Sequence, residues 1–185
     1  MVQVMKSSRL FVVCFVSTYY HQPRTFPLPL KSNYTIMSTG LLHLHNLLRW
    51  VILILLVLSI VKAYTGWKGN KVFSTSDKKT WLFTLIASHI TLLLGLFQWY
   101  KFPTVEGVSV MKDPYMRFFK MEHPVSMILA ILLITLGYGM AKKNVEDAVK
   151  YKKAFRYFLL ALILILVMVP WPYKALVGRP LFPGM

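Results

Sequence analysis

Long apolar runs alternate with short basic segments along most of this chain. Residues 80–100, 124–141 and 157–173 form runs of 21, 18 and 17 residues without a single Lys, Arg, Asp or Glu. An earlier run, residues 38–61, is interrupted by Arg49 alone. A helix that crosses a bilayer needs about 20 mainly apolar residues. The pattern therefore predicts four membrane-spanning helices, near 41–63, 80–101, 122–141 and 155–173.

Aromatic residues gather at or near the ends of these runs, as expected at the headgroup level of a bilayer. Open sheets would leave backbone groups unpaired in lipid, so helices are the expected spanning structure. The composition agrees, with 56% hydrophobic residues and a mean hydropathy of +0.54. We therefore predict an all-α fold, an integral membrane four-helix bundle in contact with the lipid bilayer. The aromatic residues are Trp50, Trp67, Trp81, Trp99, Tyr100, Trp171 and Tyr173.

The net charge of +16 raises the question of nucleic-acid binding. Most basic residues flank the apolar runs, however, which is typical of membrane topology signals, and we predict no nucleic-acid partner. The segments between runs one and two and between runs three and four carry eleven Lys and Arg residues, against six on the opposite side within residues 37–185 and ten when residues 1–36 are included. Basic segments stay in the cytoplasm, so both termini are predicted to lie outside.

Residues 1–36 differ from the rest of the chain. Lys6 and Arg9 precede the short apolar run LFVVCFV, an arrangement that resembles a signal peptide without a small-residue cleavage site. The alternative is that translation starts at Met37 and that the upstream residues are a leader outside the protein. Both readings place the four-helix domain at residues 37–185. Cys14 is the single cysteine, which excludes a disulfide within one chain.

Histidines are the candidate chemical groups, because nucleotide-binding loops and protease motifs are absent from the sequence. His43 and His45 lie in the first span, His89 lies in the middle of the second and His123 begins the third. Under the predicted topology three helices offer a histidine between the outer face and the middle of the bundle. Imidazole is a suitable axial ligand for haem iron, and bundle interiors hold such cofactors.

Arg49 follows His45 by four residues, so both side chains project from one helical face. A guanidinium pairs well with a carboxylate such as a haem propionate. The sequence therefore predicts one b-type haem, with His45, His89 and His123 as candidate iron ligands and Arg49 beside them. His45 and His123 are both expected within about one to two helical turns of the outer surface, so their similar depth favours them as the two iron ligands.

Three other interpretations remain open at this stage. Membrane histidines also serve as hydrogen-bonding groups between helices, which is typical of a non-catalytic membrane subunit or scaffold. Arg49 could extend to the headgroups instead of facing inward. A transporter or proton relay that uses His89 is the third, although the chain lacks an evident inverted repeat.

Four segments resemble a known family: LHNLLRW, ASHITLLLG, RFFKMEHPVSM and VPWPYKALVGRPLF. They are similar to small bacterial inner-membrane proteins catalogued as cytochrome b-like, over about residues 37–185. The resemblance implies a haem-associated electron-transfer protein of the bacterial inner membrane, with His45, His89 and His123 as ligand candidates and Arg49 as their neighbour. Quinone or another membrane subunit is the expected electron partner. The paired histidines of a full respiratory cytochrome b are missing, so one haem is expected.

Overall fold

The computed structural model describes residues 32–102, 109–179 and 181, with only the backbone for 32–39. The chain divides into two units, Met1–Tyr34 and Thr35–Met185, and all described residues after Tyr34 belong to the second. The predicted leader in residues 1–36 lies outside the described residues, except for the stretch 32–36 at the start of the first helix.

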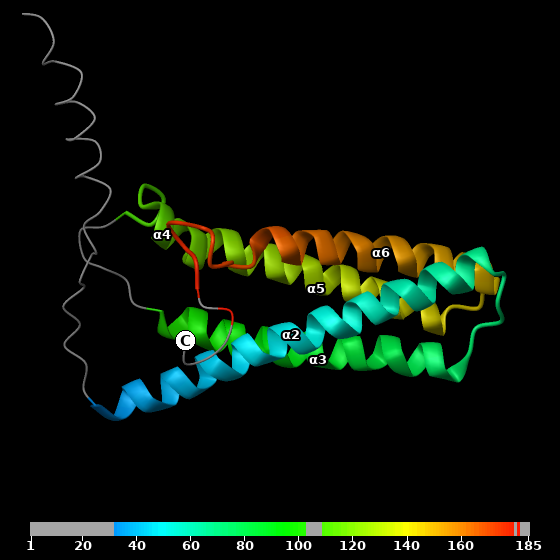
Figure 1. The fold of residues 1–185 in the computed structure, drawn as a ribbon, viewed down its shortest axis with the longest axis horizontal. Coiled ribbons are helices and arrows are strands. Elements are labelled where there is room, and N and C mark those ends of the chain that lie inside the picture. The colour runs from blue at the N-terminus through cyan, green and yellow to red at the C-terminus, as the bar shows by residue number, and fades with distance from the viewer. Residues whose placement is uncertain (1–31, 103–108, 180, 182–185) are drawn as a thin grey trace, which may run out of the picture. The chain divides into compact units, whose positions relative to one another are not determined.

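The described chain is all-helical, as predicted, and its described residues contain no strand. The long helices are α2, α3, α5 and α6. They run lengthwise beside one another (Figure 1). A short helix, α4, precedes a π-helical turn and α5, and these three form one continuous helical rod. The elements are α2 (Ser32–Lys68), α3 (Thr75–Lys101), α4 (Pro114–Arg117), the π-helical turn (Phe118–Glu122), α5 (His123–Gly139), a 3-10 turn (Met140–Lys142) and α6 (Asp147–Met168).

Three of the described helices are long and apolar enough to cross a membrane: Gly40–Lys68, Thr75–Lys101 and Pro114–Lys142. The fourth predicted span, 155–173, is shorter than expected because α6 ends at Met168. Val169 precedes Pro170, which disfavours helical backbone at Val169, and Val169 is extended with a ψ of 134°. The charge-free part of α6 is therefore about 18 Å long at 1.5 Å per residue.

Local sequence signals explain where α2 ends and α3 begins. Asn70 adopts a positive φ of 46°, and the N–H of Lys71 bonds to the carbonyl of Gly66, which closes α2 in a Schellman arrangement. Ser74 and Asp77 then form a reciprocal capping box at the first turn of α3. These two motifs produce the tight connection between the first two membrane-spanning helices.

Asp77 also joins three helices at this end of the bundle. Its carboxylate accepts a hydrogen bond from the Tyr151 hydroxyl of α6 at 2.6 Å and lies 3.3 Å from the ammonium of Lys62 on α2. Asp147, at the start of α6, accepts from the backbone N–H of Phe73. The connections between helices are thus fixed by carboxylates near the helix ends.

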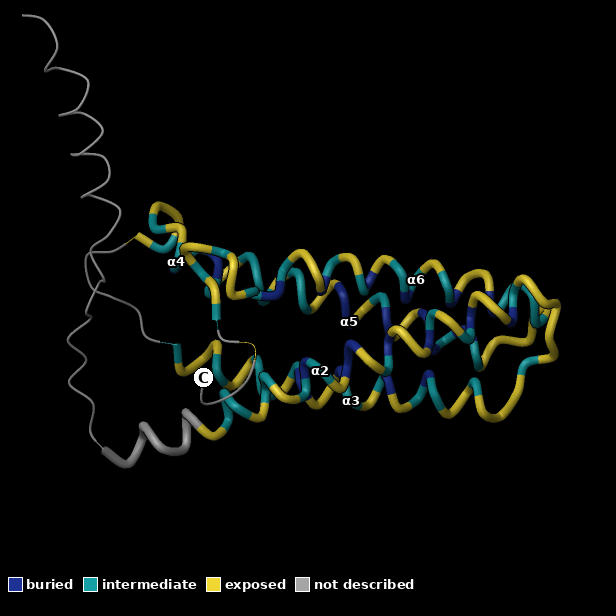
Figure 2. Tube along the Cα trace, in the orientation of Figure 1, coloured by how far each residue is buried: buried dark blue, intermediate teal, exposed yellow. Residues whose placement is uncertain are grey.

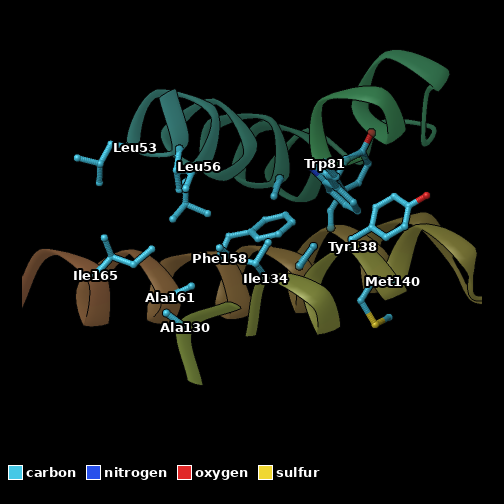
Figure 3. Close-up of a cluster of buried hydrophobic side chains, with 14 of the residues drawn as sticks. Leu53, Leu56, Trp81, Ala130, Ile134, Tyr138, Met140, Phe158, Ala161 and Ile165 are labelled. Atoms are coloured by element: carbon cyan, nitrogen blue, oxygen red, sulfur yellow. The ribbon is translucent and has the colours of Figure 1, made fainter. Parts of the chain in front are cut away.

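The core lies between the four long helices, as Figure 3 shows. Trp81 and Phe158 are fully buried, with ring centroids 5.5 Å apart in an edge-to-face contact. Glycines bring the helices close to these rings: a Cβ at Gly137 would lie 2.5 Å from Phe158, and one at Gly66 would overlap the Tyr151 ring. Close glycine contacts of this kind are typical of packing between membrane helices.

The outer faces of the helices are apolar, which suits contact with lipid. Figure 2 shows exposed positions along the outside of all four long helices. Ile54 of α2, Leu93 of α3 and Val125 of α5 are 60%, 69% and 63% exposed. Apolar surface on this scale is unusual for a protein in water. The fold is therefore that of a multi-pass membrane protein.

Candidate functional site

A cavity of about 180 Å³ opens between the helices at one end of the bundle, called here the cavity end. This is the end where α2 begins its membrane span, α3 ends, α5 begins and α6 ends. The polar residues that line it are His45, Asn46, Arg49, Ser88, Thr91, Gln98, His123 and Arg179. The structure thus brings His45, Arg49 and His123 to one site.

His123 owes its position to an irregular turn of helix. Pro124 has no N–H, and the N–H of His123 bonds to the carbonyl of Phe118 five residues earlier, which makes the turn π-helical. The carbonyl of Lys120, which Pro124 cannot engage, accepts the indole N–H of Trp99 from α3 at 2.9 Å. Proline is favoured in the first turn of a helix, but the helical rod begins at Pro114 and passes through Pro124.

The His123 ring is oriented by one hydrogen bond. Its Nδ1 donates to the carbonyl oxygen of Met168, at the end of α6, over 2.9 Å. A carbonyl can only accept, so Nδ1 carries the proton and Nε2 of the neutral ring has a free lone pair. No hydrogen bond to Nε2 occurs among the described residues. Metal-binding histidines typically show this arrangement, with the second nitrogen donating to a carbonyl.

His45 packs directly against α3. A Cβ added at Gly95 would lie 3.2 Å from Cε1 of His45, so the glycine provides the space that the imidazole occupies. Its Nδ1 is buried and has no hydrogen-bond partner among the described residues. Buried polar nitrogens are nearly always paired in folded proteins. His45 therefore lines the same cavity as His123, and its unpaired Nδ1 is enclosed against Gly95 of α3.

Arg49 is the most deeply buried charged residue that the structure describes, at 8% exposure. Its Nη2 donates to the carbonyl of Leu181 at 2.8 Å, and its Nε has no partner. The guanidinium carbon lies 5.5 and 5.8 Å from the ring centroids of Trp50 and Trp171. All of these partners are neutral, and no carboxylate pairs with Arg49 in the described part of the chain.

The segment after α6 covers the cavity end. The indole N–H of Trp50 donates to the same Leu181 carbonyl at 3.1 Å, and Arg179 donates to the hydroxyl of Tyr115 at 2.9 Å. The backbone N–H of Arg179 also bonds to the carbonyl of Pro170. We call residues 169–179 and 181 the C-terminal strap, because they link α2 to the start of α4.

His89 and His43 do not line the cavity. His89 is exposed on the outer face of α3, and its Nδ1 donates to the Leu85 carbonyl one turn earlier at 2.9 Å. His43 is half-buried, with an unpaired Nδ1. The described residues contain no group of three His, Cys, Asp or Glu side chains placed to hold a bare metal ion. Two of the three predicted iron-ligand candidates therefore share the site, and the third faces away.

Sequence reasoning missed five polar residues of the site: Asn46, Ser88, Thr91, Gln98 and Arg179. Gln98 donates to the carbonyl of Leu41 at 3.0 Å, which joins the end of α3 to α2. A glutamine within an apolar span is costly unless it finds such a partner, so Gln98 could have been recognised from the sequence as a candidate for the site. Nothing in the sequence indicated that Arg179 faces the cavity, because the strap contains no helical periodicity from which its direction could be predicted.

The donor set suits a haem, although the space is limited. Two imidazoles from α2 and α5 and a buried guanidinium are the groups that iron and propionates require. A cavity of about 180 Å³ is smaller than the roughly 300–1,000 Å³ typical of small-molecule sites. A porphyrin therefore needs more space than this cavity offers in the structure. The strap is held at this end by a few hydrogen bonds, those of Arg49, Trp50 and Arg179.

Comparison with known proteins adds no assignment. No family model matches the chain, and no curated protein or solved structure is similar enough to count as a match. The class that the fold defines is a helical, multi-pass membrane protein with a cavity near one end of its bundle. The resemblance to cytochrome b-like proteins stays a prediction.

Proposed function

We propose that this chain binds one b-type haem in the cavity and transfers electrons within the membrane. The observation that carries the proposal is the hydrogen bond from His123 to Met168, which leaves Nε2 unprotonated in a cavity that His45 and Arg49 also line. Bound there, a haem supplies a one-electron redox couple. His123 and His45 hold the iron, and Arg49 neutralises a propionate.

The protein's own contribution is to orient these groups and to exclude water. The Met168 carbonyl fixes the tautomer of His123, and Gly95 fixes the place of the His45 ring. Ile52, Ile131 and Ile165 give the cavity an apolar floor, which favours a porphyrin face over water. Quinone or another membrane subunit is the electron partner that we propose.

The decisive experiment is an absorption spectrum of protein expressed with ample haem and purified in a mild detergent. We expect a Soret band and reduced α and β bands typical of a b-type cytochrome. A preparation that stays colourless after haem-replete expression and reconstitution would refute the proposal.

A second function is supported by the same contacts: a non-catalytic membrane subunit or scaffold. The bond from His123 joins α5 to α6, and the bond from Arg49 joins α2 to the strap, as polar contacts between helices would. This reading expects colourless protein and a loss of assembly when either side chain is removed. The absorption spectrum separates the two functions.

We further propose that the protein lies in a bacterial inner membrane with the cavity end outside. The support is charge: within residues 37–185 the connections at the other end carry eleven Lys and Arg residues, against six on the side of the cavity end. Single cysteines in a Cys14→Ser background, at Lys71, Asn144 and Lys112, would test this with an impermeant maleimide on intact cells. We expect labelling at position 112 alone; labelling at 71 and 144 instead would invert the topology.

A further inference from the structure

The charges that face the cavity are all of one sign. Its charged lining consists of two guanidiniums, those of Arg49 and Arg179, and no described acidic side chain lines it. Five of the six acidic residues lie outside the cavity. At the opposite end of the bundle, Asp77 and Asp147 accept hydrogen bonds and Glu146 precedes α6. Asp113 caps α4, and Glu122 pairs with Arg117 at 2.7 Å. The sixth, Glu106, lies outside the described residues.

Arg49 is the member of this set whose charge is least compensated. The side chain is more than nine-tenths buried, its Nε has no partner, and its remaining contacts are a carbonyl oxygen and two indole rings. Removing a cation from water is strongly unfavourable unless an anion and further hydrogen bonds replace the lost hydration. The free Nε–H and the missing counter-charge together indicate that an anionic oxygen binds beside Arg49.

Arg179 provides a second cation from the opposite side of the cavity end. Its guanidinium stacks over Phe119 at 5.0 Å from the ring centroid, and only one of its nitrogens is engaged, by the Tyr115 hydroxyl. A guanidinium has five N–H donors, so most of its donors remain for another acceptor. Below the two arginines, the lining is apolar along α2, α5 and α6, where Ile52, Met127, Ile131, Ile134 and Ile165 face the cavity.

We infer that the cavity binds a membrane-resident amphiphile whose carboxylate or phosphate head lies between Arg49 and Arg179 and whose apolar part enters the bundle. A fatty acid or a phospholipid meets this description, as does any carboxylate-bearing cofactor. The inference uses the cavity of the proposed haem site but rests on charge and burial, so it holds for protein that contains no haem.

The test compares matched probes on haem-free protein in a non-ionic detergent. Oleate, oleyl alcohol and monooleoyl phosphatidate are added at equal mole fractions, and thermal unfolding is followed for each. Oleate, the phosphatidate or both should raise Tm by several degrees, because a ligand that binds only the folded state stabilises it, whereas the neutral alcohol should not. Which anion acts identifies carboxylate or phosphate as the head group.

The variants locate the effect. Arg49→Gln and Arg179→Gln should each abolish or greatly reduce the anion-dependent shift, and either suffices should the other fail to fold. Arg117→Gln removes an arginine outside the cavity that pairs with Glu122, and it should keep the full shift. Glu106→Gln should also leave the shift unchanged.

Three results would overturn the inference. An equal shift with oleyl alcohol would show that charge is irrelevant, and a shift that survives both arginine variants would place the anion elsewhere. A larger shift in Glu106→Gln would show that this side chain, not a ligand, neutralises Arg49. Because none of these measurements involves haem absorption, they are independent of the Soret band that tests the proposed function.

Discussion

The Nδ1 atom of His123 lies 2.9 Å from the carbonyl oxygen of Met168, and this single hydrogen bond connects the start of α5 to the end of α6. It also determines which ring nitrogen has a lone pair, because the carbonyl accepts only. The contact therefore serves both proposed functions equally well in structural terms. Only variants that separate its two consequences can distinguish a ligand from an interhelical contact.

Replacing His123 by alanine should abolish the Soret band, whereas His89→Ala should leave it intact. The ring of His89 is exposed on the outer face of α3 and does not line the cavity, so it is a control histidine outside the site. Absorption spectra at equal protein concentration measure both. Loss of the band in His89→Ala alone would contradict the assignment.

His123→Gln separates ligation from packing. Glutamine retains an N–H donor of comparable reach for the Met168 carbonyl, but its amide is a poor ligand for haem iron. We expect His123→Ala to cost about 1–3 kcal/mol of stability, through the unpaired carbonyl, and His123→Gln to cost less. Thermal unfolding in detergent measures this difference. A colourless but stable glutamine variant supports ligation, whereas a coloured one assigns His123 a packing role only.

Gly137→Ala and Gly139→Ala should have opposite effects on stability. A Cβ at Gly137 would lie 2.5 Å from the Phe158 ring, whereas one at Gly139 would meet nothing within 4 Å. Overpacking should cost Gly137→Ala about 1–3 kcal/mol. Gly139→Ala should gain up to about 1 kcal/mol, because alanine loses less backbone entropy in a helix. Equal midpoints of thermal unfolding for the two variants would contradict this packing.

The positions of the helices could be predicted from sequence, because charge-free length determines where a chain can cross lipid. The predicted interval 80–101 falls within α3, and 41–63 falls within α2. The irregular features could not be predicted in this way. Pro124 favours the first turn of a helix, but the indole of Trp99 satisfies the carbonyl that the proline leaves free, so the rod continues through it.

The site could be predicted in part, and the reasons why the prediction was incomplete are physical. His45 and Arg49 share a helical face by spacing alone, and both line the cavity. His89 was a candidate because it lies between the outer face and the middle of the bundle, but position along a helix says nothing about rotation around the α3 axis. Ser88, Thr91 and Gly95 line the cavity at spacings of three and four, and His89 is about 100° away from Ser88. The strap bonds through the Leu181 carbonyl, and backbone groups carry no residue-specific signal.

Acidification should weaken the connection at the start of α6 through Asp147. Hydrogen bonds from Lys150 and from the Phe73 backbone hold the pKa of this carboxyl below its ordinary value. A depressed folded-state pKa contributes stability that is present above the unfolded pKa and is lost as the pH falls below about 4. The Tm difference between the wild type and Asp147→Asn should therefore be largest near neutral pH and should shrink toward pH 3.

Glu146→Gln is the matched control for that titration. Glu146 is the neighbouring carboxylate, and its side chain makes no capping hydrogen bond to α6. Removing the Glu146 carboxylate should leave the dependence of Tm on pH the same as in the wild type. An Asp147→Asn variant whose Tm follows the wild type at every pH would show that solvent screening cancels the interaction.

Gly95 should determine whether His45 can act as a ligand. In Gly95→Ala the new Cβ would lie 3.2 Å from Cε1 of His45, so the imidazole must move by a few tenths of an ångström. Changes that disturb the orientation of a metal ligand typically lower affinity by about 10- to 100-fold. We therefore expect weaker haem retention in a competition assay with apomyoglobin, and a stronger loss in Gly95→Val.

The fold should survive this change, which makes the result specific. Alanine favours helix over glycine by up to about 1 kcal/mol, so the unfolding midpoint of Gly95→Ala should not fall by much and can rise. Gly139→Ala provides the same backbone gain with open space around the new methyl group. Reduced haem retention in Gly95→Ala but not in Gly139→Ala would identify His45 as an iron ligand. Equal retention in both would leave His123 as the single histidine ligand in the cavity, since His45 then packs against α3 without touching the iron.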